Sequence, residues 1–289
     1  MRLDPLPYRV LIDRAVAPAR AIFRPALLPV ALPFAALTVA LVVSQARWMG
    51  ALFDFEADAA ADTMFADIAF TMLMAFGVIA FQVIAYTAVT VVAMDQIAGR
   101  PLSFARAWRF AFRPGVLGTL IVVTVIMVLS VLFCLVPAIY FIPLLSLALP
   151  IMVEEDIFGA TAISRSFELG NFNPRGRLME LPWIQSGVVL TVGFLVAQGL
   201  TLIIQLPLMV YQQVLIFRAG SQGETDATLA VMNATVWAQV PSAFLGAFAQ
   251  TASWLYSAAA IGLLYLEVRR RREGADLEQA VRAVTQEPA

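Results

Sequence analysis

The chain has 289 residues, of which 61% are hydrophobic and only 13% are charged, and its formal net charge is −1. A soluble domain has about a quarter charged residues, so these charges are too few to cover a globule of this size in water. The chain has no His, no Lys and a single Cys, Cys134. These absences exclude His-based acid–base chemistry, Lys-dependent phosphate loops and an internal disulfide. The composition predicts an integral membrane protein, not an enzyme, with no cofactor or bound metal.

Five tracts without a charged residue are long enough to cross a bilayer, which takes about 20 apolar residues. They are 25–46, 68–94, 114–153, 181–217 and 227–266. The third tract is long enough for two crossings, and Pro137 near its middle should end a helix. We therefore expect a tight hairpin of two helices there, with an outer segment at 207–235 between the last two spans. The sequence predicts an all-α polytopic protein with six transmembrane helices, near 26–46, 68–93, 115–135, 138–153, 184–206 and 237–266.

The distribution of arginine predicts the orientation. Four segments would share one side of the membrane, namely 1–25, 94–114, 154–183 and 267–289, and they contain 17 of the 19 Arg. Only Arg47 and Arg218 lie on the other side. This asymmetry is typical of the positive-inside rule and predicts that both termini are cytoplasmic, in a bacterial inner membrane. Ser44-Gln45-Ala46 also fits a signal-peptidase site, but the apolar stretch before it is longer than the roughly 7–15 residues of a signal core.

Three cytoplasmic segments have amphipathic periodicity: 8–24, 103–113 and 156–169. In the second, Arg106, Arg109 and Arg113 share one helix face, and the apolar side chains of Phe104 and Trp108 share another. Helices of this kind lie in the headgroup plane with arginines toward lipid phosphates. We expect interfacial helices that contact anionic lipid headgroups, the alternative being solvated loops.

The junctions between these helices and the following spans resemble one another. Phe23-Arg24-Pro25 is similar to Phe112-Arg113-Pro114, with a fainter copy at Phe172-Asn173-Pro174. The pattern indicates a possible threefold repeat of one interfacial helix and two spans, with units 1–98, 99–156 and 157–275. Chance similarity is the alternative. We expect a single membrane domain at 1–275, followed by a cytoplasmic tail at 276–289.

Charged residues cluster where the spans leave the membrane. We expect structural ion pairs between Asp95 and Arg100, between Arg165 and the acidic run of Glu154, Glu155 and Asp156, and between Glu267 and the following arginines. Asp156 could also cap the helix that follows it. A metal site or a partner's docking site is the alternative for these acids. The run Arg269, Arg270, Arg271 and Arg272 suits anionic lipid or a partner protein, and the net charge makes nucleic acid an improbable ligand.

The last span has a face of small residues at helical spacing. Its members are Ser242, Gly246, Ala249, Ser253, Ser257 and Ala260. Small residues let helices approach closely in lipid. We expect this face to pack against another helix of the same chain, with a dimer seam as the alternative.

Three stretches resemble a family of bacterial membrane proteins. They are Asp95-Gln96-Ile97-Ala98-Gly99-Arg100-Pro101 with Ser103, then Glu154-Glu155 with Ala162-Ile163-Ser164-Arg165-Ser166-Phe167-Glu168-Leu169, and Leu264-Tyr265-Leu266-Glu267-Val268-Arg269 with Arg272-Glu273-Gly274-Ala275-Asp276-Leu277-Glu278. The family comprises the membrane domain that accompanies glycerophosphodiester phosphodiesterases, together with stand-alone proteins of unknown function. The resemblance implies a six-span bundle. It does not imply the phosphodiesterase activity, because that chemistry uses His and a separate soluble domain.

These features favour one function over two others. We expect a non-catalytic membrane scaffold or accessory subunit that binds lipid and a membrane or cytoplasmic partner protein. The alternative is a transporter or lipid-handling protein, without ion coupling because the predicted spans contain no ionisable residue of the kind that coupling uses. An intramembrane enzyme is the least favoured class, since the carboxylates lie at the ends of the spans.

Overall fold

A computed structural model describes residues 8–53, 60–133, 135–172, 180–222 and 225–286. Every regular element in these ranges is a helix, which confirms the predicted all-α class. Contacts divide the chain into two compact units, each built from stretches that are distant in sequence. Unit 1 comprises Met1–Arg24, Tyr86–Gly193 and Trp254–Ala289, and unit 2 comprises Pro25–Ala85 and Phe194–Ser253.

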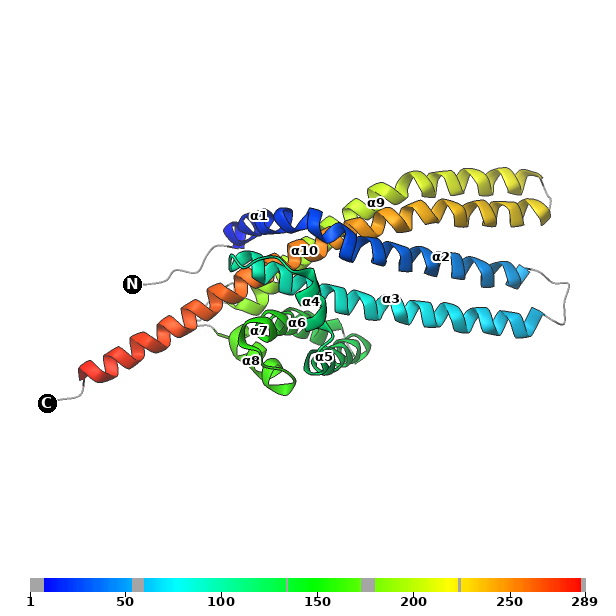
Figure 1. The fold of residues 1–289 in the computed structure, drawn as a ribbon. Coiled ribbons are helices and arrows are strands. Elements are labelled where there is room, and N and C mark those ends of the chain that lie inside the picture. Colours follow the sequence, from blue (N-terminus) through cyan, green and yellow to red (C-terminus); the bar gives the residue numbers. More distant parts are fainter. Residues whose placement is uncertain (1–7, 54–59, 134, 173–179, 223–224, 287–289) are drawn as a thin grey trace. The chain divides into compact units, whose positions relative to one another are not determined.

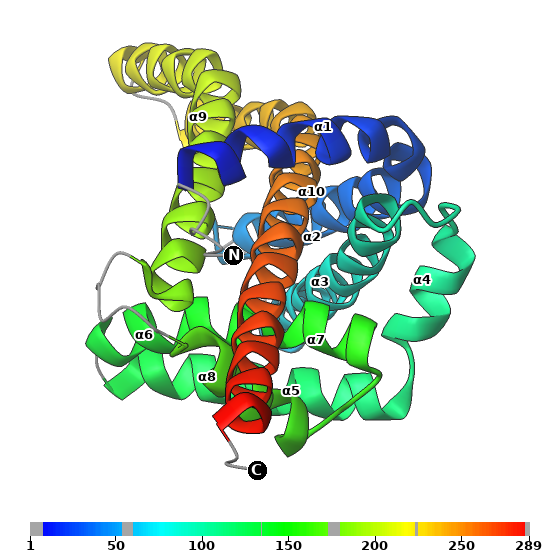
Figure 2. The same cartoon turned by 90° about the vertical axis from the view of Figure 1, so that its left-hand side faces the viewer.

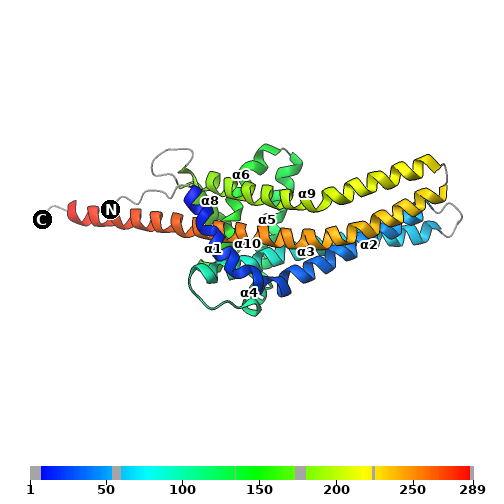
Figure 3. The same ribbon diagram turned by 90° about the horizontal axis from the view of Figure 1, so that it is seen from above.

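Unit 2 is made of long apolar helices (Figures 1 and 3). It contains α2 (Leu32–Phe53), most of α3 (Ala60–Ile97), the second half of α9 (Pro182–Gln222) and the first part of α10 (Thr225–Gln286). Phe34 stacks on Phe81 with ring centroids 6.1 Å apart, and the hydroxyls of Ser44 and Thr71 are 2.5 Å apart. The contact residue that comes later in α2 (Ser44) pairs with the one that comes earlier in α3 (Thr71), so the two helices are antiparallel.

The first predicted junction, at Phe23-Arg24-Pro25, does not interrupt the helix. Helix α1 (Tyr8–Ala26) continues through η1 (Leu27–Ala31), one turn of π-helix, directly into α2. The amide of Leu32 donates to the carbonyl of Leu27, five residues back. Pro29 and Pro33 have no amide hydrogen, and the wider turn accommodates them without ending the helix. The predicted interfacial helix and first span are therefore one continuous helical segment.

The predicted span 138–153 consists of two helices. Helix α5 (Pro114–Phe133) is followed by α6 (Leu135–Ser146) and α7 (Ala148–Glu155). Pro150 lies four residues after Ser146, so its ring crowds the Ser146 carbonyl and it offers that carbonyl no amide hydrogen. This conflict explains the interruption at Leu147. Pro137, expected to end a helix, instead lies in the first turn of α6, where proline is tolerated.

Helix α8 (Ala160–Gly170) packs along α6 and α7. At its start, the Gly159 amide donates to Thr119 of α5 (2.6 Å), and just beyond its end Asn171 and Tyr140 of α6 are hydrogen bonded (3.1 Å). The apolar side of α8 thus faces protein, which differs from the predicted placement on lipid.

Five helical segments in the described part of the chain are long and apolar enough to cross a membrane. They are Val10–Ala46, Phe65–Ile97, Pro114–Leu132, Pro137–Glu155 and Pro182–Tyr211. This finding supports a multi-pass membrane protein. The predicted span 237–266 is not among them, although α10 includes it. That stretch contains many Ser, Gln and Ala, which lower its mean hydropathy. Its residues from Trp254 to Tyr265 are largely buried in unit 1.

The long helices extend past the predicted spans. Helix α9 has 41 residues and passes through Pro207, and α10 has 62 residues and continues to Gln286. The predicted outer segment 207–235 and the start of the tail are therefore helical wherever they are described. The possible threefold repeat stays a prediction: its first junction is a continuous helix, its second is a break at Phe112–Arg113, and its third extends into 173–179, outside the described residues.

The predicted small-residue face of α10 is mostly buried. Ser242, Ala249, Ser253, Ser257 and Ala260 are buried, whereas a Cβ on Gly246 would meet nothing within 4 Å. Among the described glycines, Gly262 has the nearest neighbour to its Cβ position, and it does not belong to the predicted face. A Cβ there would lie 2.7 Å from the sulfur of Met94 on α3.

Candidate functional site

The charged residues at the ends of α3, α7 and α8 form one connected network with α10 in unit 1. It begins at Asp95, whose side chain is completely buried. Its Oδ1 is 2.8 Å from Nε of Arg100 and 3.1 Å from Nη1 of Arg106. Gly99, with a φ of 68°, reverses the chain so that Arg100 returns to Asp95, and this conformation favours glycine. Two arginines thus compensate one buried carboxylate.

The position of Arg106 follows from the start of helix α4 (Phe104–Ala111). Ser103 is the N-cap, and its hydroxyl accepts a hydrogen bond from the Arg106 amide at 3.3 Å. Capping of this kind satisfies an amide that otherwise has no partner in the first turn. The cap fixes where α4 begins, and with it the side of the helix from which Arg106 reaches Asp95.

The network continues from Arg100 to α7. Arg100 donates to Glu154 near the end of that helix. The next acid, Glu155, accepts a hydrogen bond from the Tyr265 hydroxyl of α10 at 2.9 Å, and its Oε2 is 3.3 Å from Nε of Arg165 on α8. Arg269 in turn donates to the Tyr265 hydroxyl at 3.4 Å. Helix α10 passes beside α7 and α8 in this region (Figure 2).

Glu168 links α8 to α10 a second time. Its carboxylate is 3.0 Å from Nη1 of Arg272 and 3.2 Å from Nη1 of Arg165. Hydrogen bonds from Arg272 first and Arg165 second hold the pKa of this exposed carboxyl below its ordinary value of 4.5. Arg165 therefore bridges Glu155 and Glu168, and α8 is held to α10 at two points.

The structure forms some of the predicted ion pairs and pairs the other residues differently. Asp95 contacts Arg100 as expected, but of the three acids at 154–156 only Glu155 contacts Arg165. Asp156 does not cap the following helix; it adopts a left-handed conformation (φ 52°) and contacts Arg113 at 3.0 Å, and the N-cap of α8 is Gly159. Further along α10, the pairs are Glu267 with Arg271 and Glu273 with Arg269.

Three residues with these contacts were not among the predicted site residues: Tyr265, Glu168 and Glu273. All three belong to the stretches on which the family resemblance rests, and the structure brings the three stretches together. Asp95 and Arg100 come from the first stretch, Glu155, Arg165 and Glu168 from the second, and Tyr265 and Arg272 from the third. The sequence did contain a signal for Tyr265. It lies one helical turn before Arg269, a spacing at which two side chains on a helix can contact each other.

A pocket of about 580 Å³ lies beside α4. Its lining comprises Val91, Arg106, Arg109, Phe110, Arg113, Val153 and Asp156. All three arginines of the segment 103–113 that the sequence predicted to contact lipid headgroups therefore line one cavity. The other predicted lipid-contact residues, Arg269 to Arg272, lie on α10, where Arg270 is exposed and the other three form ion pairs.

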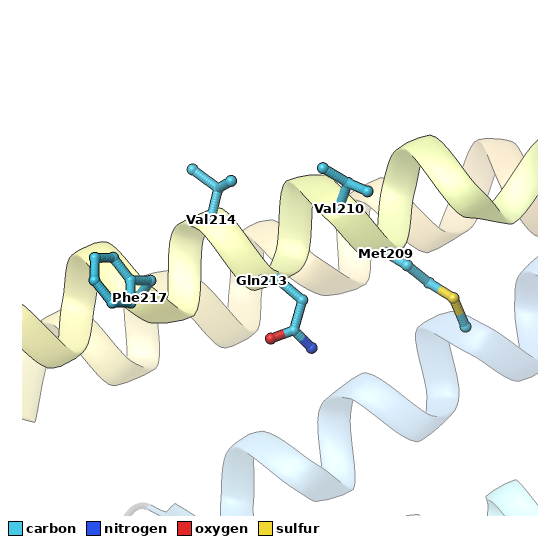
Figure 4. A pocket seen from close by; sticks show the side chains of 5 residues that line it. All are labelled: Met209, Val210, Gln213, Val214 and Phe217. Atoms are coloured by element: carbon cyan, nitrogen blue, oxygen red, sulfur yellow. The ribbon is translucent and has the colours of Figure 1, made fainter.

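Two apolar hollows lie on the surfaces of the described helices. One, of about 570 Å³, lies between α5, α6 and the start of α9, with Ile139, Pro143 and Val188 among its lining residues. The other lies along α9 in unit 2, where Met209, Val210, Gln213, Val214 and Phe217 surround it (Figure 4). Both have almost entirely apolar linings, which suits contact with hydrocarbon.

Comparisons of the chain with protein-family models, with curated proteins and with solved structures found no match. The family resemblance of the three stretches therefore stays a prediction. The geometry of the network and of the pocket is the basis for assigning a function.

Proposed function

We propose that the protein is a non-catalytic scaffold or accessory subunit of the bacterial inner membrane, which binds anionic lipid at its cytoplasmic end and a partner protein. One observation supports this proposal above the others. The carboxylates of Asp95, Glu154, Glu155, Asp156, Glu168, Glu267 and Glu273 are all within ion-pair distance of an arginine of the same chain. Acids used in this way hold helices together, and exposed arginines such as Arg109 and Arg270 remain available to anionic lipid.

We propose that both termini and the arginine-rich segments are cytoplasmic, in line with the positive-inside rule. Helices α2, α3, α9 and α10 cross the bilayer in this arrangement. The tract from α5 to α7 starts and ends on the cytoplasmic side, whether it crosses twice, as in the six-span scheme, or enters only part of the way. The contact of Tyr140 with Asn171 favours partial entry, because Asn171 belongs to the cytoplasmic segment 154–183 and Tyr140 to the predicted outer end of a span.

The family resemblance is a separate part of the proposal. The meeting of its three stretches in one network supports the idea that they form a structural unit of the membrane domain. In a membrane domain that accompanies a catalytic domain, such a unit would serve to position a partner. We propose that role here, without any phosphodiesterase activity.

The experiment measures lipid preference and partner binding separately. The full chain is reconstituted into nanodiscs of phosphatidylcholine with increasing phosphatidylglycerol, and native mass spectrometry counts the lipids that stay bound. A lipid-binding scaffold retains phosphatidylglycerol in preference to phosphatidylcholine and co-purifies with one defined protein at a fixed ratio. Equal retention of both lipids together with the absence of such a protein would contradict the proposal.

The groove between α5, α6 and α9 favours a second candidate function, lipid handling. Its lining is almost entirely apolar, and the hydroxyl of Thr191 donates to the Gly187 carbonyl of its own helix at 2.8 Å. An acyl chain in the groove would therefore leave this hydroxyl paired. A lipid-handling protein would accelerate exchange of a fluorescent phospholipid between leaflets of proteoliposomes, and Val188→Trp would block that exchange. A scaffold would not accelerate the exchange, and Val188→Trp would then have no effect on it.

A further inference from the structure

We propose that the pocket beside α4 is a binding site for the phosphate group of an anionic phospholipid, with Arg109 and Arg113 as its principal ligands. This inference rests on the proposed lipid-binding function and adds the ligand class and the residues. It follows from three properties of the pocket: its uncompensated positive charge, its apolar floor and the contacts that restrict Arg113.

The charge of the lining is the first property. Three arginines, Arg106 and Arg109 on α4 and Arg113 just after it, line the pocket together with one carboxylate, that of Asp156. Arg106 contacts buried Asp95, and Arg113 contacts Asp156. Arg109 is exposed, and in the described residues no carboxylate lies within ion-pair distance of it; its Nε donates to the Ala105 carbonyl at 3.3 Å. Its two terminal nitrogens can therefore bind a phosphate in the bidentate geometry that guanidinium favours.

The floor of the pocket distinguishes a lipid phosphate from a soluble one. Val91 of α3, Phe110 of α4 and Val153 of α7 form this apolar part. Val91 and Val153 lie near the ends of two candidate membrane spans, Phe65–Ile97 and Pro137–Glu155. A site at the ends of spans lies at the level of the headgroups. The glycerol and upper acyl carbons of a lipid can cover an apolar floor, which a hydrated soluble anion leaves exposed to water.

The residues next to the pocket also suit a membrane surface. Leu102 precedes α4 and Phe112 follows it, and their exposed fractions are 36% and 56%. Exposed apolar side chains on both sides of an arginine-rich helix are typical of helices that lie at the lipid–water boundary. They would enter the bilayer beside the bound headgroup, so the pocket would open toward lipid.

Two contacts restrict the side chain of Arg113 before any ligand binds. Its guanidinium lies over the ring of Phe110 at 5.2 Å, and Asp156 holds one of its nitrogens at 3.0 Å. Phe110 in turn packs against Phe158, with 6.2 Å between ring centroids. Because these contacts already restrict the side chain, less conformational entropy is lost when a phosphate binds.

The test compares single variants of the full chain in nanodiscs of phosphatidylcholine with phosphatidylglycerol. Arg109→Gln and Arg113→Gln should each weaken the retention of phosphatidylglycerol about fivefold, the change expected for one arginine near anionic lipid. Arg270→Gln is the matched control, because it removes the same charge from an exposed arginine outside the pocket. Any loss of retention that it causes measures the general attraction between arginine and anionic lipid, and both pocket variants should lose more than this control. Unchanged melting temperatures would show that the variants fold.

A second arm separates the two sources of phosphate. Glycerol 3-phosphate at millimolar concentration should not displace phosphatidylglycerol from the native protein, because it cannot cover the apolar floor. Displacement that Arg109→Gln abolishes would support the phosphate site but overturn its assignment to lipid. Retention in both pocket variants that is no lower than in Arg270→Gln would overturn the site while leaving the general lipid preference, and thus the proposed function, intact. Loss of that preference in the native protein would overturn both.

Discussion

The hydroxyl of Tyr265 donates a hydrogen bond to Glu155 at 2.9 Å, across 110 positions of the chain. The same carboxylate contacts Arg165, so one residue at the end of α7 holds both α8 and α10. Tyr265 is completely buried, and a buried hydroxyl that has lost its partner is costly. This hydrogen bond joins α10, which includes the last predicted span, to α7.

Replacing Tyr265 by Phe should lower the free energy of unfolding by about 1 kcal/mol, the net value of one hydrogen bond. Tyr256→Phe on the same helix is the control, because its buried hydroxyl has no hydrogen-bond partner in the described structure. Thermal unfolding in detergent should show a lower melting temperature for the first variant only. Equal effects of the two substitutions would mean that the bond to Glu155 contributes no stability.

Reversing the charge of Arg165 should destabilise the protein. In Arg165→Glu a third acid faces Glu155 and Glu168, so we expect a loss of about 1 kcal/mol or somewhat more for these partly exposed pairs. Glu155→Arg in the same chain should restore part of the stability. Arg270→Glu controls for the change in net charge. If the double variant is no more stable than Arg165→Glu, the contact with Glu155 is not the cause of the loss.

Gly262 should tolerate no larger side chain. Its Cβ position is 2.7 Å from the sulfur of Met94 and 3.2 Å from Cδ1 of Ile97, so Gly262→Leu should cost about 1–3 kcal/mol through overpacking. Gly246→Leu adds the same side chain to α10 where a Cβ meets nothing within 4 Å. Its melting temperature should equal or exceed that of the native protein. A comparable loss in both variants would argue against close packing at Gly262.

The depth of the α5–α6 joint can be measured with single cysteines. Leu132 and Ile139 are 75% and 61% exposed on the two sides of this joint. With partial entry of this tract, Leu132→Cys and Ile139→Cys in a Cys134→Ser chain should resist an impermeant maleimide added to intact cells. Phe65→Cys should react, because the predicted topology places the segment between the first two spans, 47–67, outside the cytoplasm. Labelling of all three from outside would instead support six full spans.

The contribution of Glu168 should disappear in acid. Arg272 and Arg165 lower the pKa of its carboxyl below 4.5, so its stabilising effect is fully present above that value and is lost as the pH falls through the lower, folded-state pKa. The melting temperature of Glu168→Gln should lie below that of the native protein at pH 7, and the two should converge at acidic pH. A constant difference at every pH would assign the effect to packing.

The sequence by itself determined the helical membrane class, because uncharged tracts long enough to cross lipid and a shortage of charge admit few other folds. It also indicated which charged residues lie at helix ends, and that one family-like stretch pairs Asp95 with Arg100. These are local properties. A tract of about 20 apolar residues or an acid a few positions from an arginine has much the same effect in any helical membrane protein.

The tertiary structure decided the partners. Glu154, Glu155 and Asp156 are consecutive, yet they contact Arg100, Arg165 and Arg113 on different elements. Successive residues of a helix point about 100° apart, and Asp156 adopts a left-handed conformation, so each acid meets whichever element lies in its direction. Adjacency in sequence cannot supply that information. It depends on how α4, α8 and α10 pack around the end of α7.

Tertiary packing also decided which prolines interrupt a helix. The segment around Pro25 and Pro29 continues through a π-turn, whereas the chain breaks at Leu147 before Pro150. Every proline lacks an amide hydrogen, but whether the helix widens or breaks depends on the space around it and on the groups that satisfy the freed carbonyls. Likewise, arginine counts predict the side of the membrane but are the same for a crossing hairpin and a shallow one. In the proposed orientation, the hydrogen bond between Tyr140 and Asn171 favours the shallow arrangement, and this bond exists only in the folded chain.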